Sequence, residues 1–291
     1  MHNKSWMARL MAAPHVVWSI LFILAPLAFV FYYAFTDKTG AFTLNNIKEL
    51  GSASYLDIFT RSLCFALAAT AICLLVAYPL AYAISRAKPR SQKICIMLTM
   101  LPMWMNFLIR TYSIMAILED TGFLNSLLGR IGLPPLHIIN TGGAVIFGMV
   151  YNYLPYMVLP LYTIMVKIDN SVIEAAQDLG ANVYHVVAKV LVPLSMPVLA
   201  TVSLWCIVGH WNAWYDCMLY IRDDTKYVLQ YTLQRILLDG QVQDLDHIGT
   251  KVNTETMKMA SIVVSILPIM IIYPFVQKYF TKGVMIGAVK G

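Results

Sequence analysis

Residues 174–193 read Glu-Ala-Ala-Gln-Asp-Leu-Gly-Ala-Asn-Val-Tyr-His-Val-Val-Ala-Lys-Val-Leu-Val-Pro. Ser171 and Glu174 have the spacing of a capping box, which predicts a helix start at this point. On a helix the segment has a charged face and an apolar stripe, formed by Val172, Ala176, Leu179, Val183, Val186 and Val190. Gly180 interrupts the stripe, and because glycine weakens a helix by about 1 kcal/mol and tolerates positive φ, we expect two short helices hinged there. Pro193 marks the start of the next apolar run. The stripe suits a groove on a partner protein or the lipid headgroups, and periodicity alone leaves both interpretations open.

Apolar runs recur along the chain at lengths near those needed to cross a bilayer. Hydrophobic residues make up 59% of the 291 residues, and charged residues only 12%. We identify six runs near the roughly 20 residues that a membrane-spanning helix needs: 14–36, 62–85, 94–118, 143–166, 196–221 and 259–277. Each span must satisfy its own backbone in lipid, and isolated Gly and Pro residues suit helices better than barrel strands. The sequence therefore predicts an all-α integral membrane protein with one transmembrane domain over residues 1–291.

The distribution of charge predicts the orientation of these helices. With both termini in the cytoplasm, the three acids on that side are Asp169, Glu174 and Asp178, against eleven cations: Lys4, Arg9, Arg86, Lys88, Arg90, Lys93, Lys167, Lys189, Lys278, Lys282 and Lys290. The outer segments hold nine cations and eleven acids, which satisfies the positive-inside rule. Residues 167–193 then form a cytoplasmic loop, and residues 222–258 form a polar extracytoplasmic loop that is either a plain surface connection or a docking element. The net charge of +6 is a signal of topology and gives no reason to invoke nucleic acid.

Motifs for chemistry within the chain are missing. The sequence has no Gly-x4-Gly-Lys-Ser/Thr phosphate loop, so any ATP must be hydrolysed by another subunit, and we expect no cofactor bound by this chain. Tyr215-Asp216 resembles half of an intramembrane aspartyl protease site, but a second aspartate inside a span is lacking. His-Glu-x-x-His and Gly-x-Ser-x-Gly motifs are also absent. Five scattered cysteines indicate neither a disulfide framework nor a metal site. We expect a protein that is not an enzyme.

Polar and aromatic residues inside the predicted spans are candidates for lining a solute path. An arginine at the centre of a membrane helix costs about 2.5 to 3.5 kcal/mol, so we expect Arg110 to face protein or water and not lipid. The candidate path residues are Asn106, Arg110, Tyr112, Asn152, Trp211, Asn212 and Asp216. Hydrogen bonding between helices is the alternative role for the polar members, and anchoring at the membrane interface is the alternative for the aromatic ones. Such residues also occur in channels and secondary transporters, which remain a second functional class.

The loop at 167–193 resembles a known signature. Glu174, Ala175, Ala176 and Gly180, followed after nine residues by Val190-Leu191-Val192-Pro193, resemble the Glu-Ala-Ala-x3-Gly-x9-Ile-x-Leu-Pro motif of binding-protein-dependent ABC importer permeases. Two conservative departures place valine where the motif has isoleucine and leucine. Residues 1–197 resemble spermidine/putrescine permeases, through Leu-Pro-Met-Trp-Met-Asn-Phe-Leu-Ile-Arg-Thr-Tyr at 101–112. Residues 198–291 resemble oligosaccharide permeases, through His-Trp-Asn-Ala-Trp-Tyr-Asp at 210–216.

The resemblance implies an architecture and a set of partners. It implies the type I ABC importer permease fold in a bacterial inner membrane, with six transmembrane helices and both termini cytoplasmic. A second, usually paralogous permease subunit, two ATP-binding cassette subunits and an extracytoplasmic solute-binding protein would complete the transporter. Coupling to the ATPase would fall to Glu174, Ala175, Ala176, Asp178, Gly180 and Pro193. The expected solute is a polyamine, with oligosaccharide as the alternative. A channel or secondary transporter has no reason to carry the coupling signature.

Overall fold

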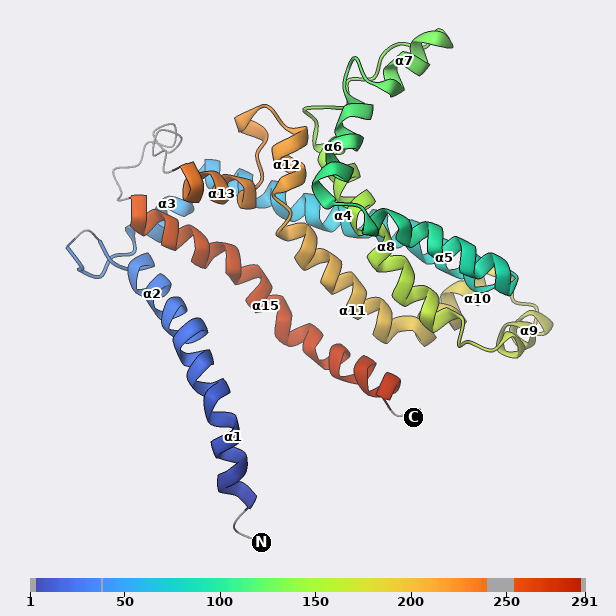
Figure 1. The fold of residues 1–291 in the computed structure, drawn as a ribbon, viewed down its shortest axis with the longest axis horizontal. Helices are drawn as coiled ribbons and strands as arrows, with labels where there is room; N and C mark the ends of the chain where they lie inside the picture. Colours follow the sequence, from blue (N-terminus) through green and yellow to red (C-terminus); the bar gives the residue numbers. More distant parts are fainter. Residues whose placement is uncertain (1–3, 38, 240–253, 289–291) are drawn as a thin grey trace. The chain divides into compact units, whose positions relative to one another are not determined.

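The computed structural model describes residues 4–37, 39–239 and 254–288. Most of these residues lie in helices, which are joined by short connections (Figure 1). In chain order the helical elements are α1 (Lys4–Ser19), η1 (Ile20–Leu24), α2 (Ala25–Ala34), α3 (Asn45–Leu50), α4 (Ala53–Ser85), α5 (Pro89–Trp104), α6 (Phe107–Leu118), α7 (Phe123–Arg130), α8 (Gly142–Met165), α9 (Asn170–Asp178), α10 (Val183–Val186), η2 (Val187–Leu191), α11 (Val192–Trp211), α12 (Tyr215–Tyr220), η3 (Asp224–Lys226), α13 (Leu229–Asp239) and α15 (Thr254–Ala288). Within the described ranges, β pairing is limited to one isolated bridge between Thr36 and Phe42. The predicted all-helical class is confirmed.

Four helical segments are long and apolar enough to cross a membrane. They are Met11–Ala34, Ala53–Ser85, Gly142–Met165 and Val183–Trp211, and a fifth span results if the bent pair Pro89–Trp104 and Phe107–Arg130 is counted as one. The shorter apolar stretch Lys258–Pro274 lies within α15, where the sixth span is predicted. Four or five of the six predicted spans are therefore supported by length and composition, and the span 259–277 stays a prediction.

The predicted span 94–118 is broken near its middle. Helix α5 ends at Trp104 and α6 begins at Phe107, and the chain bends by 97° between the segments Pro89–Trp104 and Phe107–Arg130 (Figure 1). Pro102 sits in the last turn of α5, where it cannot donate a backbone hydrogen bond. Asn106 restarts the helix as an N-cap, because its side-chain oxygen accepts a hydrogen bond of 2.9 Å from the backbone amide of Leu108. The expectation of one continuous helix was wrong here, since the apolar character of the run hid the break.

The predicted span 196–221 is also divided. The helix containing it starts earlier, at Val183, and runs through η2 and α11 to Trp211. Asn212 forms its C-cap, and Tyr215–Tyr220 form the separate short helix α12. Pro193 occupies the first turn of α11, although the preceding η2 continues the helix without a break. Asp216 therefore lies on α12 and not inside the long helix.

The chain forms two compact units, each with its own apolar core. The first comprises Met1–Asp57 and Thr232–Pro268, with a small core of Ala34, Leu50, Tyr55, Ile236, Ala260 and Val263. The second comprises Ile58–Tyr231 and Ile269–Gly291. Its larger core joins α4, α8 and α11 with α9 and α10, through Cys73, Ala77, Tyr78, Ala81, Ile84, Met157, Val158, Leu161, Met165, Ile173, Val186, Leu191, Val202 and Cys206. Small side chains on α4 allow close approach of the neighbouring helices.

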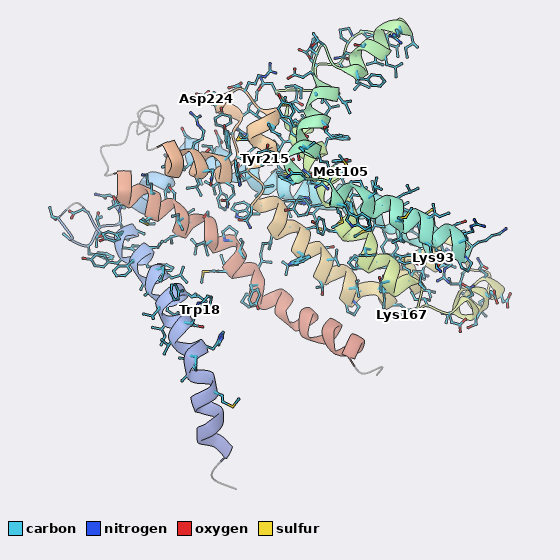
Figure 2. All side chains as sticks on the ribbon, viewed as in Figure 1. Trp18, Lys93, Met105, Lys167, Tyr215 and Asp224 are labelled. Atoms are coloured by element: carbon cyan, nitrogen blue, oxygen red, sulfur yellow. The ribbon has the colours of Figure 1, made fainter. Side chains whose placement is uncertain are left out.

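Three labelled charged residues lie at opposite ends of the second unit. Lys93 and Lys167 lie at one end, next to α9, whereas Asp224 lies at the other end (Figure 2). This separation agrees with a cytoplasmic end that carries α9 and an outer end that carries η3. The orientation in a membrane stays a prediction. Residues 1–3, 289–291 and the 240–253 part of the predicted outer loop lie outside the described residues.

Candidate functional site

Helix α9 opens the segment that resembles a coupling loop. Asp169 is its N-cap, and its carboxylate accepts a hydrogen bond of 3.0 Å from the backbone amide of Ser171. Hydrogen bonds from the amide and the hydroxyl of Ser171 hold the pKa of the Asp169 carboxyl below its usual value. The predicted capping box of Ser171 and Glu174 is therefore wrong. Asp169 takes the cap instead, because its extended backbone and its negative charge suit the helix start.

The predicted hinge at Gly180 is confirmed. Helix α9 ends at Asp178 and α10 starts at Val183, with Gly180 between them at φ +85°. The side chain of Asn182 caps α10 by accepting a hydrogen bond of 2.9 Å from the backbone amide of His185. This backbone conformation favours glycine, because an L-side chain in the left-handed region collides with its own carbonyl.

The apolar stripe of this segment divides into an anchored part and an exposed part. Ile173 and Val186 are buried in the core of the second unit. Leu179, Val183 and Tyr184 point outward, with exposed fractions of 90%, 67% and 75%. The single stripe predicted from the sequence is thus wrong as a continuous face, because Val186 faces the bundle while Leu179 and Val183 do not. Sequence reasoning also missed Ile173 and Tyr184, which the i, i+4 pattern does not include.

We define the exposed apolar patch as Leu179, Val183 and Tyr184. Of the predicted coupling residues, Asp178 and Gly180 are sequence neighbours of Leu179, and Pro193 lies in the first turn of α11. Glu174, Ala175, Asp178, Gly180 and Pro193 are exposed and Ala176 is half-buried. Their role in coupling stays a prediction. The segment thus combines a fixed base with an open apolar surface.

Polar residues from three helices meet inside the second unit. Arg110 of α6 donates from Nε to Oδ1 of Asn152 on α8 over 3.1 Å, and Asn152 donates from Nδ2 to Oδ1 of Asp216 on α12 over 2.9 Å. Arg110, Asn152 and Asp216 are exposed by only 6%, 2% and 2%. The prediction that Arg110 faces protein is confirmed. Arg110 and Asp216 do not pair directly, since the amide of Asn152 stands between them.

Arg110 also secures the break between α5 and α6. Its Nη1 donates to the backbone carbonyl of Pro102 over 2.8 Å, at the end of α5. Its guanidinium lies over the rings of Phe107 and Tyr151, at 5.7 and 5.8 Å from their centroids. A cation at a helix C-terminus is favourable, because the free carbonyls there carry partial negative charge. One side chain therefore joins α5, α6 and α8.

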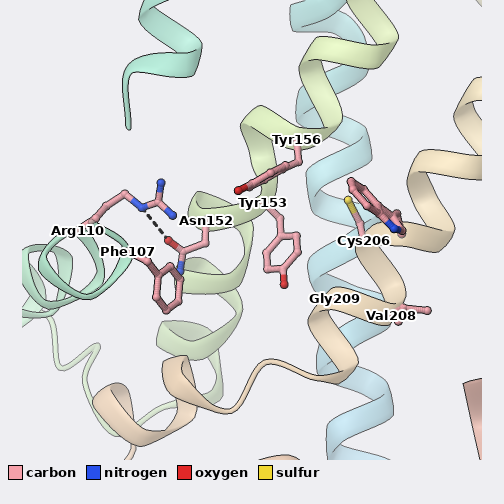
Figure 3. Close-up of a pocket in the computed structure, with 9 residues that line it drawn as sticks. Phe107, Arg110, Asn152, Tyr153, Tyr156, Cys206, Val208 and Gly209 are labelled. Atoms are coloured by element: carbon pink, nitrogen blue, oxygen red, sulfur yellow. Dashed lines mark hydrogen bonds between the residues drawn. The ribbon is translucent and has the colours of Figure 1, made fainter. Parts of the chain in front are cut away.

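A pocket of about 360 Å³ opens beside this polar network (Figure 3). Its wall combines four aromatic side chains with the polar side chains of Arg110 and Asn152, and comprises Phe107, Arg110, Asn152, Tyr153, Tyr156, Trp205, Cys206, Val208 and Gly209. Gly209 allows α8 and α11 to approach, since an added Cβ would come within 2.4 Å of the Tyr153 ring. The volume and the mixture of aromatic and polar groups are typical of a site for a small ligand.

The structure brings together only part of the predicted path. Arg110 and Asn152 line the pocket, whereas Asp216 is buried behind Asn152 and is not part of the wall. Asn106 and Asn212 serve helix ends, and Trp211 is buried against Phe59 with its ring centroid 5.3 Å away. Tyr112 is 57% exposed and lies outside the pocket. Tyr153, Tyr156 and Trp205 also lie in the pocket wall and are not among the predicted path residues.

Comparison with known proteins gives related sequences and a related fold. No protein-family model matches the chain. The chain is 39% identical over 188 residues to the spermidine/putrescine transport system permease protein PotB of Haemophilus influenzae, covering 62% of this chain and 66% of that protein. It is 34% identical over 205 residues to PotB of Salmonella typhimurium, covering 68% and 71% of the two chains. It is also 37% identical over 129 residues to the polygalacturonan/rhamnogalacturonan transport system permease protein YtcP of Bacillus subtilis, covering 43% and 45%.

Two solved structures share the fold along nearly the whole chain. A bacterial ABC transporter involved in the import of the acidic polysaccharide alginate aligns with a TM-score of 0.73 at 22% identity, over 96% of this chain and 98% of that one. The alginate transporter in complex with an alginate pentasaccharide-bound periplasmic protein also aligns with a TM-score of 0.73, at 17% identity, over 94% and 93% of the two chains.

Proposed function

Because this chain belongs to the family of ABC importer permeases that includes the spermidine/putrescine permease PotB, we propose that it forms half of the membrane path of an ATP-driven importer. A second permease subunit forms the other half. Two ATP-binding cassette subunits bind on the cytoplasmic side, and an extracytoplasmic protein delivers the solute. The chain itself lacks a phosphate loop and takes part as a transport subunit of the inner membrane.

The exposed apolar patch on α9 and α10 carries this proposal. Leu179 is 90% exposed and directly follows α9, which is anchored through the buried Ile173. Lys93 and Lys167 lie at the end of the second unit that carries α9 (Figure 2). An amphipathic helix of this kind binds in a groove of a partner through its apolar side. ATP and loaded receptor each favour one state of the transporter, and the patch transmits that preference between them.

A polyamine is the proposed solute, and an oligosaccharide is the second candidate. The polyamine rests on PotB, which matches more of this chain than YtcP does. Aromatic faces such as Tyr156 and Trp205 attract a cation through their π-systems. The oligosaccharide is favoured by one observation: the pocket wall contains Arg110 and Asn152 but no acidic residue to balance a polycation.

The test is reconstitution with the genomic neighbours of the chain in proteoliposomes that contain ATP. We expect uptake of labelled spermidine when the binding protein is present. Uptake of labelled oligosaccharide without spermidine uptake would reverse the order of the two solutes.

Leu179→Asp tests, in the same complex, whether the exposed apolar patch binds the ATPase subunit. We expect this variant to insert normally but to lose most of the co-purifying ATPase. The matched control is Leu127→Asp on α7, an exposed leucine of the predicted outer side, which should retain the ATPase. Equal ATPase retention by both variants would remove the patch from the proposal.

A further inference from the structure

Arg86 connects three helices of the second unit, α4, α8 and α9, on their predicted cytoplasmic side. It follows directly after α4, and its guanidinium is half-buried. Nη2 donates to the carbonyl of Met165 over 3.2 Å, and Nη1 donates to the carbonyl of Ile168 over 3.2 Å and to Oδ1 of Asn170. Met165 ends α8 and Asn170 begins α9, so a single side chain bridges the end of one helix and the start of the next.

The chemistry of these acceptors explains why an arginine stands here. The last carbonyls of α8 have no partner within their own helix, and they carry partial negative charge. A planar guanidinium can donate to several acceptors at once in a fixed geometry, whereas an ammonium group has no such fork. Arg86 therefore adds a second donor to the Met165 carbonyl, which also accepts from the backbone amide of Ile168 over 3.2 Å, and fixes the direction in which the chain leaves α8 toward α9.

Polar groups surround the joint between Arg86, the end of α8 and the start of α9, so hydrogen bonds hold this joint more than apolar packing does. A polar cavity of about 450 Å³ lies beside it, with Ser85, Gln92, Lys167 and Asp169 among the lining residues, so apolar packing does not fill the joint. Gln92 of α5 donates to the carbonyls of Ser85 and Ala87 and accepts from the Tyr162 hydroxyl over 3.1 Å. Apolar contact holds α9 elsewhere, through the buried Ile173.

From these contacts we infer that Arg86 is a positioning residue for coupling: it fixes the start of α9 to the ends of α4 and α8. This inference rests on the proposed function, because it concerns how force at the ATPase reaches the membrane helices. A movement imposed on the exposed patch of α9 and α10 passes through the Arg86 joint to α4 and α8. Without the joint, α9 is held mainly by its apolar anchor and moves with less effect on the bundle.

The test compares Arg86→Gln, Arg86→Lys and the control Lys88→Gln in the full reconstituted transporter. Lys88 is exposed, lies in the same connection and loses the same charge in its variant. We expect Arg86→Gln to lower receptor-stimulated ATPase activity by roughly fivefold or more, with basal activity kept. Arg86→Lys should recover only part of this loss, because it restores the charge without the fork, and Lys88→Gln should behave as wild type.

A distance measurement separates loss of positioning from general damage. Spin labels at Arg90 and Gln177, both exposed, report the spacing of α5 and α9. We expect a broader distance distribution in Arg86→Gln and an unchanged one in Lys88→Gln. If Arg86→Gln fails to insert, Asn170→Ala takes its place, since it removes one acceptor at an exposed position, and it should produce the same two changes to a smaller degree.

Two results would overturn the inference, and they differ from failure of the proposed function. Wild-type stimulation and an unchanged distance distribution in Arg86→Gln would show that the joint does not couple. If Arg86→Gln does not insert, wild-type stimulation and an unchanged distance distribution in Asn170→Ala would show that the joint does not couple. A wild-type complex whose ATPase does not respond to the loaded receptor would instead remove the proposed function itself.

Discussion

At the scale of single residues, the buried Asn152 cannot be replaced without loss of two hydrogen bonds, because its amide accepts from the Arg110 guanidinium and donates to the Asp216 carboxylate. Asn152→Leu would leave Arg110 and Asp216 buried without this bridge, and removing one partner of a buried charged network costs about 3 to 5 kcal/mol. We expect a large fall in the thermal stability of the purified permease. Asn212→Leu, at an exposed amide on a helix end, is the control and should change stability little. Replacing all three network residues by Met or Leu should recover much of the loss; if it does not, the packing around Asn152 and not its polarity is responsible.

At the scale of elements, the hinge between α9 and α10 depends on one backbone conformation. Gly180→Ala should strain the hinge, because a side chain at φ +85° costs about 1 to 2 kcal/mol, although nothing lies within 4 Å of the added Cβ. Gly132→Ala is a matched control: its φ is +74°, its surroundings are equally open, and it follows α7 on the predicted outer side. We expect Gly180→Ala alone to weaken binding of the ATPase subunit in pull-down measurements. Equal weakening by both variants would mean that the hinge has no special role in docking.

The same scale shows what the sequence could and could not predict. Hydrophobicity is a local property, so the C-terminal ends of the spans at Ala34, Ser85 and Met165 were predicted to within two residues, whereas the second span starts at Ala53 and not at residue 62. The breaks at Met105 and Asn212 were missed, because apolar and aromatic residues continue on both sides of each break. The Gly180 hinge was predicted, because the positive φ that it requires depends on the residue type at that one position and not on contacts elsewhere. The cap at Asp169 was missed because Ser171 is an equally good cap by composition, and the contact of Asn170 with Arg86 belongs to tertiary structure.

At the scale of the whole molecule, the separation of charge predicts which parts of the chain face which compartment. In a variant that lacks all five cysteines, Lys88→Cys and Asp178→Cys should resist a membrane-impermeant thiol reagent in intact cells, whereas Asp224→Cys should react. The reason is that cations gather in the segments next to α9, and cationic segments stay in the cytoplasm. All three should react after the membrane is permeabilised, which controls for access. Reaction of Asp178→Cys in intact cells would place α9 outside and exclude its contact with an ATPase.

The Arg110 network also has a consequence for biosynthesis. Asn152 follows Arg110 by 42 residues, and Asp216 follows Asn152 by a further 64. At a synthesis rate of about 5 to 20 residues per second, the arginine therefore emerges roughly 5 to 20 seconds before its carboxylate. During that interval α6 carries an uncompensated charge and cannot settle in lipid at low cost. We therefore expect α6 to settle in the bilayer only after α12 has been made, and to stay until then within the insertion machinery or at the membrane surface.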